Sequence, residues 1–172
     1  MNLRETILSE HSKTNCDRIV TWIGSNQQRF NELFYLFLND ESRVTQRAAW
    51  PLSFSAIAHP ALMKNNFEKL IKNLHHPNLH DVITRNTVKL LQQIEISEEC
   101  EGDVMNICFQ YVESPTEAVA IKAFSLTILG KLAKKFPEIL PEIKLLIEGQ
   151  SEHQTAAFKS RSKRLLKEHA LL

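Results

Sequence analysis

Apolar side chains recur every three or four residues along almost the whole chain. In the stretch NFEKLIKNL, Phe67, Leu70, Ile71 and Leu74 occupy positions i, i+3, i+4 and i+7. This spacing places all four side chains on one face of an α-helix. The chain has only four glycines and six prolines, too few for the frequent turns of a β-sandwich or barrel. The pattern therefore predicts an all-α protein.

The same apolar stripe returns at a fixed spacing of 37 residues. It occurs once before and once after the first stretch, at Phe30, Leu33, Phe34 and Phe37, and at Val104, Ile107, Cys108 and Tyr111. A fourth copy, PEIKLLIE, keeps only Leu145 at a stripe position. A period of this length is typical of repeat proteins in which each repeat is a pair of helices.

The repeat predicts alternating first and second helices. We expect first helices near residues 28–38, 61–75, 100–113 and 137–149, and second helices near 41–58, 78–95, 115–135 and 152–168. Residues 3–25 break the pattern and are expected to form one or two shorter capping helices. The predicted organisation is a single domain, 1–172, with a cap at 1–27 and repeats at 28–58, 61–95, 100–135 and 137–168.

Three short motifs mark expected helix starts. SPTE at 114–117 combines a capping Ser, a Pro suited to the first helical position and a Glu that completes a capping box. SEHQ at 151–154 is the same box without proline, and NLHD at 78–81 is a weaker relative.

The second helices share a column of cations. Arg47, Arg85, Lys122 and Lys159 recur at spacings of 38, 37 and 37 residues, near the first turns of these helices. Small residues follow directly at Ala48, Ala123 and Ser160, where they would let neighbouring helices approach closely, although Asn86 breaks this second column.

These residues resemble HEAT-type (armadillo-like) helical repeats. FNELFYLFLNDESRVTQRAAWPLSFSAIA and SPTEAVAIKAFSLTILGKLAKKFPEILPEIKLLIE are similar to that family's apolar helix, Asp-containing turn and Val-Arg-x-Ala-Ala-like second helix. The resemblance covers roughly residues 28–168. It implies an α-solenoid, a right-handed superhelix of about four helix pairs, whose second helices line a concave surface that usually holds a partner. It also implies an Asp–Arg ladder, which Asp40 and Arg47 match only loosely.

The second helix of the first repeat carries an unusual Trp-Pro pair. Arg43, Arg47, Trp50 and Phe54 fall on one stripe, whereas the expected buried stripe is Val44, Ala48, Leu52 and Ala56, with Pro51 beside it. Pro51 is expected to kink the helix rather than end it, because apolar residues continue beyond it. For Trp50 two interpretations remain open: a partner-binding aromatic with a guanidinium over its indole, or packing between repeats.

The last predicted helix is strongly basic. FKSRSKRLLK contains Lys159, Arg161, Lys163, Arg164 and Lys167. This group suits a phosphate backbone or an acidic peptide, and it equally suits a solvated end of the solenoid. An acidic run at 95–103 makes the protein a mosaic of charges.

Composition and charge narrow the setting. A hydrophobic fraction of 43% with 24% charged residues is ordinary for a globular protein, and the net charge of +1 gives no overall attraction to nucleic acid or to membranes. The three cysteines, Cys16, Cys100 and Cys108, lack C-x-x-C spacing and are expected to be buried and reduced. No signal peptide or membrane span is predicted, so we expect a cytoplasmic protein.

No catalytic motif accompanies the repeats. The chain lacks G-x-S-x-G, Walker, G-x-G-x-x-G and H-E-x-x-H patterns, and His75, His76 and His80 are expected in an exposed turn rather than at a metal. We therefore predict a non-enzymatic protein-binding or scaffold module without a cofactor. The predicted partner-binding residues are Arg43, Arg47, Trp50, Arg85, Lys122, Lys159, Arg161 and Arg164. The alternative is a nucleic-acid-associated protein related in architecture to the alkylpurine DNA glycosylases.

Overall fold

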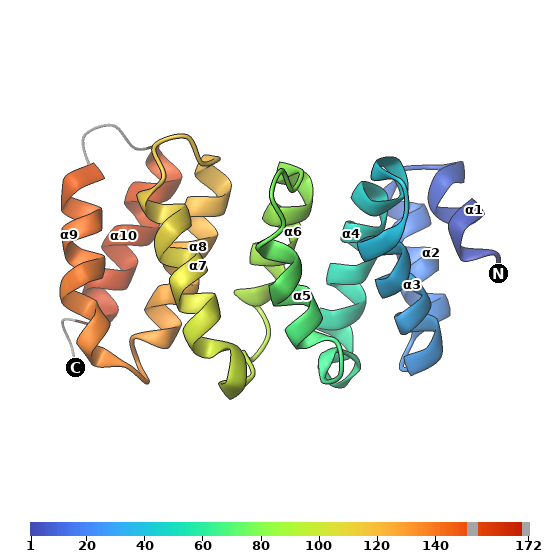
Figure 1. Cartoon of the computed structure of the whole chain (residues 1–172), viewed down its shortest axis with the longest axis horizontal. Helices are drawn as coiled ribbons and strands as arrows, with labels where there is room; N and C mark the ends of the chain where they lie inside the picture. Colours follow the sequence, from blue (N-terminus) through green and yellow to red (C-terminus); the bar gives the residue numbers. More distant parts are fainter. Residues whose placement is uncertain (151–154, 170–172) are drawn as a thin grey trace. The chain divides into compact units, whose positions relative to one another are not determined.

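The computed structural model describes residues 1–150 and 155–169, and every regular element within these ranges is helical (Figure 1). The prediction of an all-α fold is confirmed. The chain forms two compact units, Met1–Ser97 (unit 1) and Glu98–Leu172 (unit 2). The division falls between the second and third predicted repeats, so each unit contains two of them.

Unit 1 is organised around one long central helix. Its elements are α1 (Leu3–Ser9), α2 (Lys13–Ile23), α3 (Gln27–Asn39), α4 (Ser42–Ala58), a 3-10 turn (Pro60–Met63), α5 (Phe67–Leu74) and α6 (Asp81–Leu91). Helix α4 packs against α1, α2, α3, α6 and the 3-10 turn. The short helices α1 and α2 are the predicted N-terminal capping elements.

Unit 2 repeats the helix-pair arrangement. It contains a 3-10 turn (Glu98–Cys100), α7 (Glu101–Glu113), α8 (Val119–Leu132), a second 3-10 turn (Pro137–Ile139), α9 (Leu140–Gln150) and α10 (Ala156–His169). Helix α8 packs against both α7 and α10, and Figure 1 shows these helices side by side. The two second helices of this unit are therefore direct neighbours.

The predicted apolar stripes form the core. All four stripe residues of α3 and of α5 are buried, as are Val104, Ile107 and Cys108 of α7, with Tyr111 half-buried. The fourth copy differs, because Leu145 is 69% exposed and α9 buries Ile143 and Ile147 instead. Buried positions of α9 therefore follow their counterparts in α7 after 39 residues rather than after the predicted 37.

Helix α4 continues through Pro51 to Ala58, so the prediction that proline does not end it is confirmed. Val44, Ala48, Leu52, Ala56 and Pro51 are all buried, as their spacing predicts. Pro51 lacks the N–H that would bond the Arg47 carbonyl, a defect that costs about 3 kcal/mol in an exposed helix. The packing of α4 against four other helices offsets this cost.

Two of the predicted helix starts are wrong. Helix α8 begins at Val119, five residues after the predicted Ser114, and the Glu117 carboxylate accepts from the Ala118 N–H at 2.9 Å. Ser-Pro also suits a turn, because Pro presets the backbone angle of a turn's second residue, and here that local preference prevails. Helix α6 begins at Asp81, with Nδ1 of His80 accepting from the Val82 N–H at 3.2 Å. The SEHQ motif lies outside the described residues.

The predicted helix at 61–75 is interrupted. Its first part forms the 3-10 turn, and α5 begins only at Phe67. The interruption is held by the buried Asn66, whose side-chain N–H donates to Oδ1 of Asn31 at 2.9 Å and to the Leu62 carbonyl at 3.4 Å. A side-chain amide here replaces the hydrogen bonds that a continuous helix would make.

The buried residues of the second helices align the repeats with one another differently from the predicted alignment. The aligned buried small residues are Ala48, Thr87, Ser125 and Ser162, spaced by 39, 38 and 37 residues. The predicted small residue Ser160 is exposed. In the observed register Arg47 is equivalent to Asn86, Phe124 and Arg161, so the predicted column of Arg47, Arg85, Lys122 and Lys159 does not share one environment.

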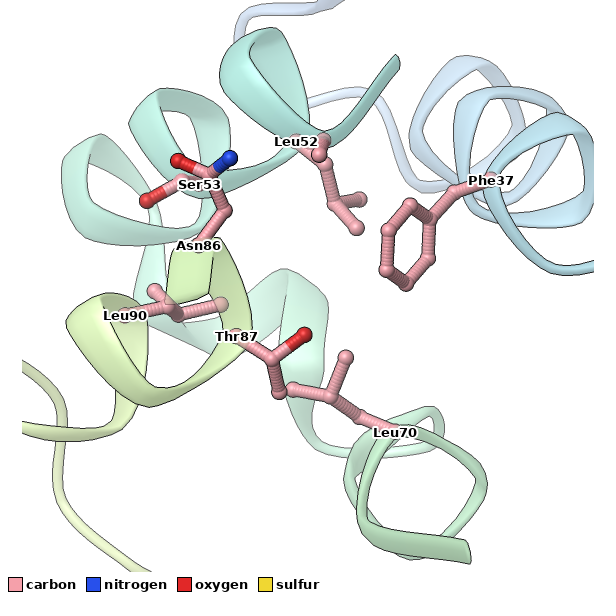
Figure 2. A pocket seen from close by; sticks show the side chains of 8 residues that line it. Phe37, Leu52, Ser53, Leu70, Asn86, Thr87 and Leu90 are labelled. Carbon is pink, nitrogen blue, oxygen red and sulfur yellow. The ribbon is translucent and has the colours of Figure 1, made fainter. Parts of the chain in front are cut away.

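A small cavity lies inside unit 1 between α3, α4, α5 and α6 (Figure 2). It has room for about one water molecule. Its wall includes Phe37, Leu52, Leu70 and Thr87, and the Thr87 hydroxyl points into the space and bonds to no other protein group that the structure describes.

Candidate functional site

Arg47, predicted to bind a partner, holds the N-terminal helix of unit 1 in place. Its Nη1 donates to the Leu8 carbonyl at 2.8 Å and lies 3.5 Å from the Ile7 carbonyl. These carbonyls belong to the last turn of α1, where helix carbonyls lack partners and attract cations. Arg47 therefore caps the C-terminus of α1.

The predicted Asp40–Arg47 pair does not form. Asp40 is instead engaged by Arg4 of α1, with Nε–Oδ2 and Nη2–Oδ1 distances of 2.9 and 3.0 Å. The hydrogen bond from Arg4 lowers the pKa of the Asp40 carboxyl, and the bond from the Glu41 N–H adds to this effect. Arg4 and Arg47 together fasten α1 onto the first repeat.

Trp50 lies half-buried in an aromatic cluster of three residues, His11, Trp50 and Phe54. The indole meets the His11 ring edge-on at 5.7 Å and the Phe54 ring at 6.2 Å between centroids. Phe54 is 39% exposed, so the cluster reaches the surface of unit 1. Among the described residues, the guanidinium–indole contact is that of Arg29 with Trp22, with 4.8 Å between Arg29 Cζ and the ring centroid, rather than one at Trp50.

The remaining predicted residues of unit 1 are at the surface. Arg43 is exposed one turn before Arg47 on α4, and Arg85 is exposed on α6. Arg43, Trp50 and Phe54 share the solvent side of α4, as the sequence predicts. This face combines an exposed cation with partly exposed aromatic rings.

The prediction for Lys122 is wrong. Its side chain is 3% exposed, and Nζ donates to Oε1 of Gln150 at 3.1 Å. Gln150 in turn donates to the Val112 carbonyl at 2.6 Å. Burial lowers the pKa of Lys122. This lysine links α8 to α9 inside unit 2 and does not present its charge to a partner.

The predicted residues of α10 differ in their surroundings. Arg161 is half-buried, donates to Oγ1 of Thr127 at 2.5 Å and lies over the Phe124 ring at 5.0 Å. Arg164 is exposed and pairs with Glu168 one turn later at 2.8 Å. Lys159 is exposed on the first turn of α10. Arg161 is therefore held against α8, while the other two extend into solvent.

Two further lysines were not identified from the sequence. Lys131, in the last turn of α8, and Lys134, just after the helix, are exposed, and the charge of Lys134 lowers the pKa of Glu168. The run KLAKK at 131–135 was available as a signal. Its relation to α10 depends on the packing of two helices far apart in sequence.

His75, His76 and His80 are exposed, as predicted. In the part of the chain that the structure describes, no group of three potential ligands converges on a metal site. All three cysteines are buried, as predicted, and none forms a disulfide with another. Burial raises the pKa of Cys16 to about 11 and that of Cys108 to about 12, which disfavours their nucleophilic thiolates.

A family model described as a HEAT repeat domain matches residues 3–169 of the chain. No curated protein and no solved structure matches it. Within the described ranges, no helix combines the length and apolar character needed to cross a bilayer.

Proposed function

We propose, from the premise that the chain belongs to the HEAT repeat domain family, that it is a non-enzymatic module that binds another protein. The proposed surface is the solvent side of α4 in unit 1. The family is a helical scaffold commonly used for protein binding, and this general role follows from membership. The identity of the surface is our own proposal.

One observation carries the choice of surface. On α4 the aromatic cluster reaches solvent through Phe54, and Arg43 is exposed on the same helix face. Aromatic rings beside arginine are the composition of interface residues that contribute most to affinity. Trp50 is half-buried and packs edge-on against the Phe54 ring, so it contributes to the packing of unit 1 and also positions Phe54 at the surface.

The three cysteines are buried and form no disulfide with one another, which favours a reducing compartment and supports our proposal of a cytoplasmic location. The raised pKa values of Cys16 and Cys108 support a non-enzymatic role for these thiols.

Affinity purification from the native host with Phe54→Glu tests the surface. Tyr35→Glu is the matched control, because Tyr35 is 65% exposed but lies on the first helix α3. We expect a protein that is retained by the wild type and by Tyr35→Glu and lost with Phe54→Glu. Arg47 is left unchanged, because its loss would release α1. Identical retained proteins for all three would refute the proposed surface.

A further inference from the structure

The two helix layers of unit 2 carry opposite charge. The first helices and their preceding turns, residues 98–113 and 137–150, contain eight acidic residues and one lysine. The second-helix segments, residues 119–135 and 156–169, contain nine lysines and arginines and one glutamate. In unit 1, residues 27–39 and 60–74 contain four basic and two acidic residues, and 42–58 and 81–91 contain four and one. The charge separation is therefore specific to unit 2.

Four of these cations gather where α8 and α10 pack together. We call Lys131, Lys134, Arg161 and Arg164 the basic surface. Helices α8 and α10 are joined by the Arg161–Thr127 hydrogen bond and by Nε2 of His169, 3.0 Å from the Gly130 carbonyl oxygen. Three of the four cations are exposed and Arg161 is half-buried.

Within the basic surface, Lys131 and Lys134 lie close enough to repel each other, as do Arg161 and Arg164. Burial and then the charge of Lys134 lower the pKa of Lys131, and burial and then the charge of Arg164 lower the pKa of Arg161. Glu168, the one acidic residue within residues 119–135 and 156–169, is paired with Arg164. With nine lysines and arginines, these segments carry a formal excess of positive charge that an anionic partner would complement.

Arg161 is also positioned in advance of binding. Thr127 accepts its hydrogen bond and the Phe124 ring supports its guanidinium. A guanidinium held in place loses less conformational freedom when it meets a carboxylate than one on a freely moving stem.

We propose that the basic surface of unit 2 binds an extended segment rich in Asp and Glu from a partner protein. This inference rests on the proposed protein-binding function and assigns it a second surface and a partner chemistry. Helix α10 has 14 residues and is about 21 Å long, which an extended chain spans with about six residues. A short acidic peptide is therefore long enough to extend along the basic surface.

The acidic first-helix layer of unit 2 disfavours nucleic acid as the partner of the basic surface. Duplex DNA carries a charge about every 1.7 Å and extends well beyond four side chains. The eight acidic residues of the first-helix segments would oppose a polyanion of that size. A peptide of a few residues contacts the basic surface alone.

A labelled peptide of about ten alternating Glu and Asp residues tests the inference by fluorescence anisotropy with the full chain. The disrupting variant is Lys134→Glu with Arg164→Glu. The matched control is Lys69→Glu with Lys144→Glu, which removes the same net charge from exposed lysines of α5 and α9. We expect at least about a tenfold loss of affinity for the disrupting variant, equivalent to about 1.4 kcal/mol, and less than about twofold for the control.

Glu168→Gln provides a test in the opposite direction. Removing the Glu168 carboxylate, which pairs with Arg164, is expected to tighten peptide binding by about twofold or more, and this variant also serves if the double variant fails to fold. Helical content and melting of each variant are checked by circular dichroism.

Three outcomes would overturn the inference: no peptide binding by the wild type at about 50 mM salt, an equal loss for the control variant, or displacement of the peptide by duplex DNA at about 150 mM salt. DNA displacement with a steep salt dependence would identify a phosphate-binding surface instead. None of these outcomes bears on the Phe54→Glu experiment, which tests the proposed function through unit 1.

Discussion

Replacing Arg47 by methionine is expected to destabilise unit 1 by loosening α1. Methionine keeps most of the aliphatic stem and removes the guanidinium that donates to the Leu8 carbonyl at 2.8 Å. Helix α1 has only seven residues and no basic side chain in its last turn, so nothing on the helix itself replaces the lost donor.

The size of the effect follows from the type of bond. A hydrogen bond with a charged donor contributes about 1.5–3 kcal/mol when it is partly buried. We therefore expect Arg47→Met to lower the free energy of unfolding by about 2 kcal/mol. With a denaturant dependence of about 2 kcal/mol per molar urea, the unfolding midpoint of unit 1 falls by about 1 M.

Tryptophan fluorescence during urea unfolding measures this shift selectively. Both tryptophans of the chain, Trp22 and Trp50, lie in unit 1, so their emission follows that unit alone. Circular dichroism recorded in parallel follows the helices of both units.

Arg43→Met is the matched control. Arg43 is on the same helix, one turn earlier, and is exposed. Its replacement is expected to change the free energy of unfolding by less than about 0.5 kcal/mol. Equal midpoints for the two variants would refute the capping role of Arg47 and return it to the group of candidate surface cations.

Three further predictions concern buried polar groups. Because burial lowers the pKa of Lys122, the unfolded chain binds more protons than the folded chain at pH values just below the usual pKa of lysine, so the free energy of unfolding of the wild type rises with pH there. Lys122→Met should lack this pH dependence. At neutral pH its free energy of unfolding should equal that of the wild type or exceed it by up to about 1–2 kcal/mol, as measured by urea unfolding followed by circular dichroism. A less stable variant would contradict this. Thr45→Val, which loses the hydrogen bond from its hydroxyl to the Asp40 carbonyl at 3.1 Å, should destabilise unit 1 by about 1 kcal/mol in urea unfolding followed by tryptophan fluorescence, and an unchanged midpoint would argue against this. Cys16 and Cys108 should react with a thiol reagent at pH 8 only after urea unfolding, since on the order of one thiol in a thousand or fewer is ionised in the fold; rapid reaction of the native protein would disprove this.

The helices themselves follow from local information. The stripes at Phe30, Phe67 and Val104 place apolar side chains on one face because backbone geometry repeats every 3.6 residues, and this spacing requires no knowledge of neighbours. The side of α4 that carries Arg43 and Trp50 was predictable for the same reason.

The exact limits of helices were less predictable. SPTE suits both a helix start and a turn, and α8 begins only at Val119. The break before α5 depends on Asn66 meeting Asn31, 35 residues away, which no local pattern encodes.

What the sequence by itself determined was the all-α repeat, the core stripes and the presence of cations on the second helices. Only the tertiary structure decided what those cations do. Arg47 caps α1, Lys122 is buried beside Gln150, and Arg161 is held against α8. The physical reason is the length of these side chains: a lysine or arginine on a known helix face reaches either solvent or a neighbouring helix, and which of these it meets depends on packing between segments distant in sequence.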